Sequence, residues 1–129
     1  MRIGVLGQGR GWHTDALVHA GQQRHHETFP IAFVDLSGRV ERAQPSLLAG
    51  GVELTSLDLV LVRSIPSGSL EQVIVRVDAL HRLHDAGIAV LNPPRAIEAC
   101  VDKYLASARL ASAGLPVTKT IVCETAERA

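Results

Sequence analysis

Two segments near the end of the chain decide its fold: VLNPPRAIEACVDKYL (residues 90–105) and AGLPVTKT (residues 113–120). The first predicts the end of a strand, an Asn-Pro turn, a short helix and a second helix that begins at Asp102-Lys103. In the second segment, Gly114 and Pro116 predict the end of that helix. A last strand is expected over Thr118–Cys123, and Cys100 is expected to be a small buried residue of the helical region.

Upstream of these segments, short apolar runs alternate with helical ones. Strands are expected over Ile3–Leu6, Phe29–Val34, Val52–Leu54, Leu57–Val62 and Ile88–Leu91, helices over His13–Gln23 and Ser69–Ala86, and a loop over Ser37–Gly51. Strands that are almost wholly apolar are typical of a sheet covered on both faces. The order predicts an α/β fold, with a doubly wound, mostly parallel sheet of four to five strands and flanking helices, as in Rossmann-like domains.

The composition narrows the classes of partner. The 129 residues carry a net charge of zero, and 47% of them are hydrophobic. A neutral chain offers no electrostatic basis for binding nucleic acid or an anionic membrane, and no apolar run approaches the roughly 18 residues that span a bilayer. The two cysteines do not form a disulfide scaffold, so we expect a cytoplasmic protein. An exposed sheet edge leaves homo-oligomerisation open.

A glycine-rich loop, GQGRG, follows the first expected strand at residues 7–11 and precedes a helix. Backbone N–H groups and a helix N-terminus in such a place can approach an anion. A dinucleotide-binding fingerprint would require a third glycine at position 12, which is Trp12, and an acid such as Asp35 after the second strand. The alternative is a tight turn or a generic small-ligand loop, with Asp35 capping a loop.

Two cations stand at positions where ligands bind in α/β proteins. Arg63 directly follows the strand expected over Leu57–Val62, at its carboxyl end, where it can hold a carboxylate or phosphate through two hydrogen bonds; the alternative is a surface arginine. Lys103 is one of only two lysines and lies in the first turn of a helix. A cation beside free N–H groups suits a phosphate, and the alternative is a solvated lysine.

Histidines are not expected to form a metal site. His81 and His84 lie three residues apart on one helix, and His25-His26 lies in a polar loop. A zinc site needs three or four convergent ligands, which this spacing does not supply.

From Leu57-Asp-Leu-Val-Leu-Val-Arg63 to Thr120, the chain resembles the N-terminal (pre-ATP-grasp) domain of RimK-like glutamate ligases. The strongest elements are Leu91-Asn-Pro93, Asp102-Lys103 and Gly114-Leu-Pro-Val-Thr118. The segment IPSGSLEQ (residues 65–72) and Pro93-Pro94 are also similar to a branch of these ligases found beside tetrahydromethanopterin-linked one-carbon genes. The first half of the chain matches only in its order of strands and helices.

The resemblance implies a function and a set of site residues. Such ligases use ATP to activate a carboxylate as an acyl phosphate, which an amine then attacks. Lys103 matches a lysine that contacts ATP phosphates, and the residues expected at the substrate are Arg63, Gly7, Gly9 and Asn92. Lys119 has no role in the pattern.

The resemblance also implies how the chain is organised. Residues 1–116 would form the pre-ATP-grasp domain, and residues 117–129 would begin the ATP-grasp domain that binds most of the ATP and Mg²⁺. Carboxylate and amino-acid substrates are the expected partners, with no catalytic or metal-binding residue in this chain, which should be inactive alone. The alternatives are a free-standing Rossmann-type nucleotide- or effector-binding module, or a structural domain without a ligand.

Overall fold

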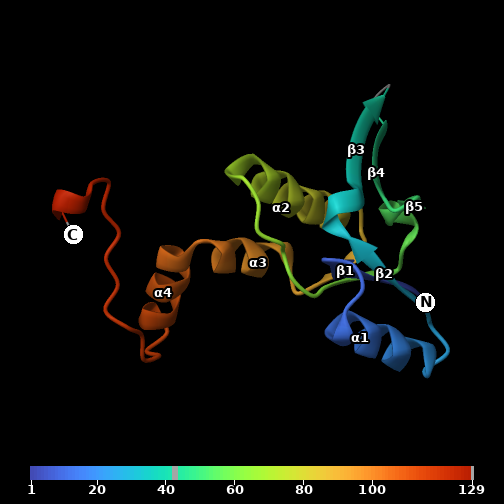
Figure 1. The fold of residues 1–129 in the computed structure, drawn as a ribbon, viewed down its shortest axis with the longest axis horizontal. Coiled ribbons are helices and arrows are strands. Elements are labelled where there is room, and N and C mark those ends of the chain that lie inside the picture. Colours follow the sequence, from blue (N-terminus) through green and yellow to red (C-terminus); the bar gives the residue numbers. More distant parts are fainter. Residues whose placement is uncertain (42–43, 129) are drawn as a thin grey trace. The chain divides into compact units, whose positions relative to one another are not determined.

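The computed structural model describes residues 1–41 and 44–128 and divides the chain into two compact units, Met1–Pro94 and Arg95–Ala129. The centre of the first unit is a four-stranded sheet (Figure 1). Its strands, in the spatial order β2-β1-β6-β7, are β2 (Glu27–Ala32), β1 (Arg2–Gly7), β6 (Leu59–Val62) and β7 (Ala89–Leu91). All three pairings are parallel, which confirms the predicted parallel α/β sheet.

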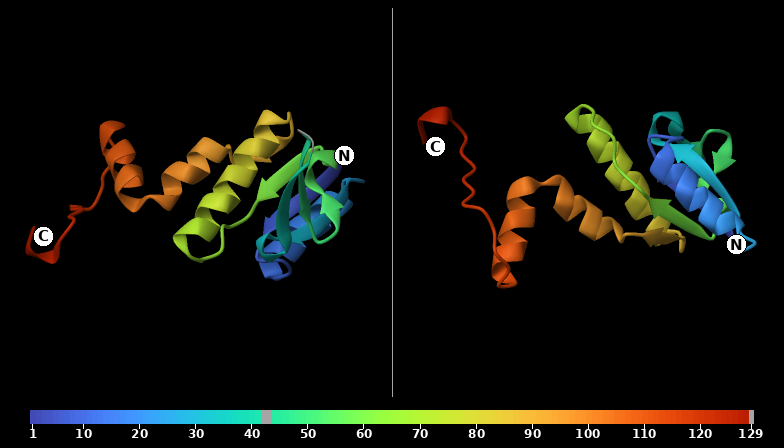
Figure 2. Two further views of the ribbon diagram at one scale, coloured as in Figure 1. Left: turned by 90° about the horizontal axis from the view of Figure 1, so that it is seen from above. Right: turned by 60° about the horizontal axis from the view of Figure 1, so that its bottom comes forward.

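Two helices connect neighbouring parallel strands. Helix α1 (Trp12–Gln22) joins β1 to β2, and α2 (Leu70–Asp85) joins β6 to β7. The two connections run in opposite directions along the sheet. Because such crossovers are right-handed, the two helices cover opposite faces of the sheet, as Figures 1 and 2 show. The doubly wound arrangement is therefore confirmed.

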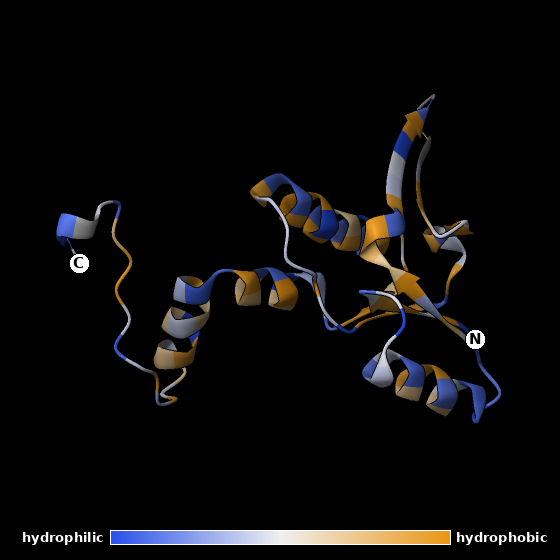
Figure 3. Cartoon of the chain, in the orientation of Figure 1, coloured by the Kyte–Doolittle hydropathy of each residue, from blue (hydrophilic) through white to orange (hydrophobic). Residues whose placement is uncertain are grey.

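The core of the first unit lies between the sheet and its covering elements. Its largest fully buried side chains are Leu6, Leu54, Leu80, Leu83, Val5 and Val60. Colouring by hydropathy shows that the strands of the four-stranded sheet are mostly apolar (Figure 3). Burying a leucine or valine of this kind stabilises the folded state by about 1.5–3 kcal/mol, so these side chains hold the sheet and its covering elements together.

Both ends of α2 follow the local sequence signals. Ser69 accepts a hydrogen bond from the Gln72 backbone N–H at 3.3 Å, and the Gln72 side chain accepts one from the Ser69 N–H at 3.0 Å. This reciprocal pair is a capping box. At the other end, Gly87 has a φ of 86°. Its N–H bonds to the His84 carbonyl, and the next N–H bonds to that of Leu83, which completes a Schellman motif.

The prediction of a loop over Ser37–Gly51 is wrong. Its described residues contribute to β3 (Leu36–Glu41) and β4 (Gln44–Ala49), which form an antiparallel sheet with the short β5 (Val52–Glu53). Gly50 and Gly51, with φ of 58° and 80°, form the two-residue turn between β4 and β5, because such turns require positive φ at both central positions. These glycines therefore connect strands rather than marking a long loop.

The second expected strand also ends earlier than predicted. Strand β2 stops at Ala32, and a 3₁₀ turn, η1 (Phe33–Asp35), follows it before β3. Another 3₁₀ turn, η2 (Leu54–Ser56), leads from β5 toward β6. The short strand expected near Val52 is confirmed as β5.

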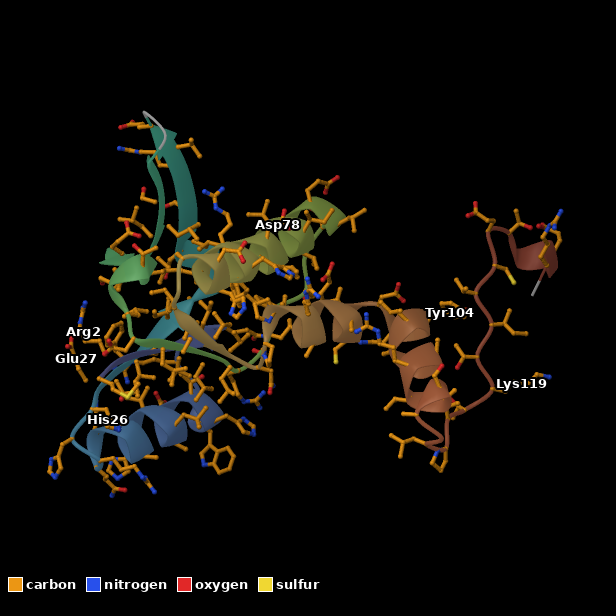
Figure 4. The ribbon with its side chains drawn as sticks, turned by 180° about the vertical axis from the view of Figure 1, so that it is seen from behind. Arg2, His26, Glu27, Asp78, Tyr104 and Lys119 are labelled. Carbon is orange, nitrogen blue, oxygen red and sulfur yellow. The ribbon has the colours of Figure 1, made fainter. Side chains whose placement is uncertain are left out.

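Arg2 ties the amino-terminal ends of three strands together. Its Nε donates to Glu27 Oε2 on β2 at 3.1 Å, and its Nη1 donates to the carbonyl and hydroxyl oxygens of Ser56 at 3.2 and 2.9 Å. Its backbone N–H donates to Asp58 Oδ2 at 2.6 Å, just before β6. Figure 4 shows Arg2 and Glu27 beside each other. These polar contacts therefore join the strands at their amino-terminal ends and leave the carboxyl-terminal ends of the strands open for a site.

The second unit is helical. It contains most of α3 (Pro94–Val101), all of α4 (Lys103–Ser112) and a 3₁₀ turn, η3 (Ala126–Arg128). Asp102 caps α4 as predicted, since its Oδ1 accepts from the Leu105 N–H at 2.9 Å. Gly114 ends α4 with a φ of 73°, and its N–H bonds to the Ala111 carbonyl. The predicted helix boundaries at Asp102 and Gly114 are confirmed.

Two expectations for the second unit are wrong. Residues 118–123 form no strand and are exposed. Cys100 is exposed rather than buried. Within the described residues, none of the helices has the length and apolar character needed to cross a membrane.

Candidate functional site

The glycine loop between β1 and α1 brings backbone groups to the carboxyl edge of the sheet. Strand β1 ends at Gly7, and α1 begins at Trp12 with Gly11 as its N-cap residue. Gly9 has a φ of 89°, a left-handed conformation that residues with a Cβ rarely adopt. Gly11 has no side chain with which to cap α1, and among residues 1–41 and 44–128 no other side chain caps it. The first N–H groups of the helix therefore remain available to a ligand.

The sheet brings Arg63 to this loop. The Arg63 backbone N–H donates to the Leu6 carbonyl at 2.8 Å, which continues the parallel pairing of β1 with β6. A Cβ built on Gly7 would lie 3.3 Å from Ser64 Oγ and 3.6 Å from Arg63 Cβ. Gly7 is therefore a point of close approach between the two segments, and the absence of a side chain there leaves room for them.

A cavity of about 310 Å³ lies where these segments meet. Its lining residues are Gln8, Gly9, Arg10, Gly11, Trp12, His13, Thr14, Arg63 and Ser64. None of these residues is an acid. Arg10 forms an ion pair with Asp15 at 3.5 Å, whereas the Arg63 guanidinium has no partner among the described residues. The cavity therefore presents an unpaired positive charge.

Two further residues of this cavity were not assigned to a site from the sequence. Thr14 is only 6% exposed, and its hydroxyl makes no hydrogen bond within the described part of the chain. Trp12 is 79% exposed, and its ring meets that of His13 edge-on, with centroids 4.6 Å apart. The available signal was their place in the first turn of a helix that follows a glycine loop.

Asn92 lies at the same edge of the sheet but does not line this cavity. Leu91 pairs with Leu61 across β7 and β6, so Asn92 leaves the sheet beside the end of β6. Its side chain is exposed. Of the predicted substrate residues in the first unit, Gly9 and Arg63 therefore line the cavity. Gly7 does not line it but lies next to Arg63 and Ser64, both of which do.

Lys103 belongs to the second unit. It is exposed at the first position of α4, and its Nζ donates to the Cys100 carbonyl at 3.1 Å. The carboxylate of Asp102 already accepts one N–H of this helix end. Lys103 therefore offers an exposed point charge, whose one hydrogen bond among the described residues is to the Cys100 carbonyl.

The arrangement does not support a dinucleotide site. Asp35, the candidate ribose ligand, is exposed in η1 and does not line the cavity at the glycine loop. Trp12 occupies the third glycine position, where close packing of helix and strand would be required. Among residues 1–41 and 44–128, no group of three or more His, Cys, Asp or Glu is placed to hold a metal ion.

A second cavity, of about 290 Å³, lies between η1 and the first turns of α2. Its lining includes Phe33, Val34, Val75 and Arg76. The Arg76 Nη1 donates to the Pro66 and Ser67 carbonyls at 2.7 and 3.3 Å, so this side chain holds the loop that follows Arg63. The Ser69 hydroxyl, which donates to Glu71 Oε2 at 2.6 Å, lowers the pKa of that carboxyl, as does the backbone N–H of Glu71.

Comparison with known proteins identifies the family. A family model described as the RimK PreATP-grasp domain matches residues 1–97. The tetrahydromethanopterin:alpha-L-glutamate ligase of Methanosarcina acetivorans is 35% identical over 122 residues, which cover 92% of this chain and 38% of that protein.

Solved structures of the ATP-grasp ligase PsnB have the same fold. The complex with precursor peptide PsnA2 and AMPPNP aligns with a TM-score of 0.64 and 24% identity over 91% of this chain and 45% of that one. The complex with a minimal precursor aligns with a TM-score of 0.66 over 92% and 45%. The chain thus spans less than half the length of each of these relatives. With three quarters of its residues matched by the family model, the chain belongs to the RimK pre-ATP-grasp domain family.

Proposed function

We propose that this chain is the N-terminal, substrate-side domain of an ATP-dependent carboxylate–amine ligase that acts through an acyl phosphate. The observation that carries the proposal is the cavity at the carboxyl edge of the sheet, where the glycine loop and Arg63 meet in a chain of this family. Ligands of open α/β sheets bind at this edge. Gly7, Gly9, Arg63 and Asn92 are the residues assigned to the substrate.

Arg63 would hold an acidic group of the substrate. Its guanidinium is exposed and unpaired among the described residues, while its backbone is fixed by the hydrogen bond to Leu6. Arginine binds carboxylates through two parallel hydrogen bonds, which set orientation as well as affinity. A substrate held in this way is positioned for attack, which is how binding residues contribute to rate.

Lys103 would contact the phosphates of ATP. ATP supplies the phosphoryl group that activates the carboxylate. Lys103 fits this role because it is exposed, stands at a helix N-terminus and is held only by its bond to the Cys100 carbonyl. The described residues do not offer a Mg²⁺ site.

The substrates proposed are an acidic acceptor and L-glutamate as the amine. Support comes from the 35% identity to a tetrahydromethanopterin:alpha-L-glutamate ligase. Tetrahydromethanopterin is therefore the first acceptor to test. The chain covers 38% of that relative, so the activity belongs to the complete protein of the native reading frame, and we expect these 129 residues alone to be inactive.

The test is ligation by that complete protein. It is incubated with ATP, Mg²⁺, L-glutamate and tetrahydromethanopterin, and the glutamylated product is followed by mass spectrometry. Lys103→Ala should reduce the rate by at least about tenfold, because the loss of one charged contact to a phosphate costs at least one factor of ten. Lys119→Ala, which changes the other lysine, should leave the rate unchanged. Equal rates for both variants would refute the role of Lys103.

A further inference from the structure

The start of α1 combines several groups that bind oxyanions. The first intrahelical hydrogen bond runs from the Asp15 N–H to the Gly11 carbonyl at 2.8 Å. The N–H groups of Trp12, His13 and Thr14 precede it and therefore have no acceptor within the helix. They also have no side-chain cap. These donors line the cavity together with the side chain of Arg63.

Thr14 gives independent evidence that the cavity is built for a ligand. The residue is 94% buried, lines the cavity and makes no hydrogen bond with its hydroxyl in the described part of the chain. No described side-chain oxygen is both sealed from solvent and without a partner, so the Thr14 hydroxyl is accessible to solvent although the residue is buried. The cavity is the space that Thr14 lines.

The charge of the lining residues favours a negatively charged ligand. Its lining contains Arg10, His13 and Arg63 but no carboxylate. Arg10 is already paired with Asp15, so Arg63 supplies the uncompensated charge. The N-terminal end of α1 adds a partial positive charge from the helix dipole. An anion that accepts several hydrogen bonds at once would complement all of these groups.

We propose that this cavity is a binding subsite for an oxyanion group, a carboxylate or a phosphate. The N–H groups of Trp12, His13 and Thr14, the Thr14 hydroxyl and the Arg63 guanidinium bind it. The assignment of this oxyanion to the acceptor substrate of the ligase rests on the proposed function. The existence of the subsite rests only on the cavity and its lining residues.

Trp12 provides a direct readout. It is the only tryptophan of the chain, it lines the cavity and it is 79% exposed. The experiment titrates the 129-residue chain with inorganic phosphate, glutarate and chloride at constant ionic strength and follows Trp12 fluorescence. Saturable binding of phosphate or glutarate, but not of chloride, is expected, and the tighter of the two identifies the group that the subsite prefers.

Two variants separate specific binding from a general effect of salt. Thr14→Val keeps the shape of the side chain and removes the hydroxyl, and Arg63→Gln changes an exposed side chain that has no hydrogen-bond partner among the described residues. Each should weaken binding by about tenfold or more, as expected for the loss of a hydrogen bond to a charged group. Arg24→Gln, at the opposite end of α1, should leave it unchanged. The proposal would be overturned if the parent chain bound neither phosphate nor glutarate, or if Thr14→Val and Arg63→Gln bound them as tightly as the parent chain does.

The result is distinguishable from that of the ligation assay. If the complete protein has no ligase activity but phosphate or glutarate binds and Thr14→Val weakens it, the proposed function fails and the subsite stands. If ligation proceeds and neither anion binds, the subsite is refuted and the proposed function stands.

Discussion

The Arg63 backbone N–H donates a 2.8 Å hydrogen bond to the Leu6 carbonyl, one residue before the glycine loop begins. This bond extends the β1–β6 ladder past the last paired residue of β6, Val62. It fixes the backbone of Arg63 beside the glycine loop. Because the bond involves main-chain atoms, it is independent of the side chain at position 63, so Arg63→Gln removes the charge without removing this link.

Gly9→Ala should destabilise the first unit. Gly9 has a φ of 89°, and its Cβ would lie 3.4 Å from Ala32 Cβ. A left-handed backbone costs a residue with a Cβ about 1–2 kcal/mol, so the free energy of unfolding in urea should fall by about that amount. The control is Gly38→Ala in β3, where the added Cβ would make only ordinary contact with Leu47, 3.6 Å away. Equal stability of the two variants would contradict the assigned loop conformation.

Gly21→Ala should destabilise α1 although alanine is the better helix former. An added Cβ would overlap Thr28 Oγ1 and lie 2.9 Å from Thr28 Cβ. Overpacking costs typically 1–3 kcal/mol, which exceeds the gain in helix propensity of about 1 kcal/mol. Thermal unfolding of Gly21→Ala, Thr28→Ala and the double variant measures the coupling. A Gly21→Ala variant more stable than the parent would show that α1 does not pack on β2 as described.

Ser69→Ala should lower the free energy of unfolding by about 1 kcal/mol. The substitution removes the side chain that accepts the Gln72 N–H at 3.3 Å and so breaks the capping box of α2. Ser67→Ala, two residues earlier, removes a hydroxyl that makes no hydrogen bond among the described residues and should have little effect. Denaturant titrations of both variants provide the comparison. If Ser67→Ala costs as much as Ser69→Ala, the cap does not stabilise the helix.

The same serine sets the acidity of Glu71. Its hydroxyl donates to Glu71 Oε2 at 2.6 Å and is the largest cause of the lowered pKa of that carboxyl. A carboxyl with a lowered folded-state pKa stabilises the fold above its unfolded-state pKa, and this contribution is lost as the pH falls through the folded-state value. In Ser69→Ala, an NMR titration should therefore show the Glu71 pKa raised. An unchanged value in Ser69→Ala would contradict the hydrogen bond, and Ser67→Ala should leave the value as in the parent.

Local signals in the sequence predicted helix ends well. Gly87 and Gly114 both end helices with positive φ and Schellman-type hydrogen bonds, because this conformation is set by the residue itself. The strands were harder, since pairing depends on distant residues. Nothing within residues 37–49 indicates that β3 and β4 pair with each other, and nothing within residues 118–123 indicates that this segment forms no strand.

The site was predictable to the extent that it follows from sheet topology. Parallel strands end at one edge, so Arg63 and the glycine loop could be expected near each other, and the cavity confirms that they meet. Thr14 could not be singled out in this way. Its burial depends on how α1 packs in the fold. That its hydroxyl has no hydrogen-bond partner among the described residues can be seen only when the positions of the neighbouring polar groups are known.

The most direct test of the central claim is the fate of an acceptor carboxylate oxygen during ligation. Tetrahydromethanopterin labelled with ¹⁸O in its carboxylates is incubated with the complete protein, ATP, Mg²⁺ and L-glutamate, and phosphate is analysed by mass spectrometry. Formation of an acyl phosphate, followed by attack of the glutamate amine, transfers one carboxylate oxygen to the released phosphate. The account predicts ADP and ¹⁸O-labelled inorganic phosphate in step with glutamylated product. Product formed with unlabelled phosphate, or label found in AMP, would contradict it.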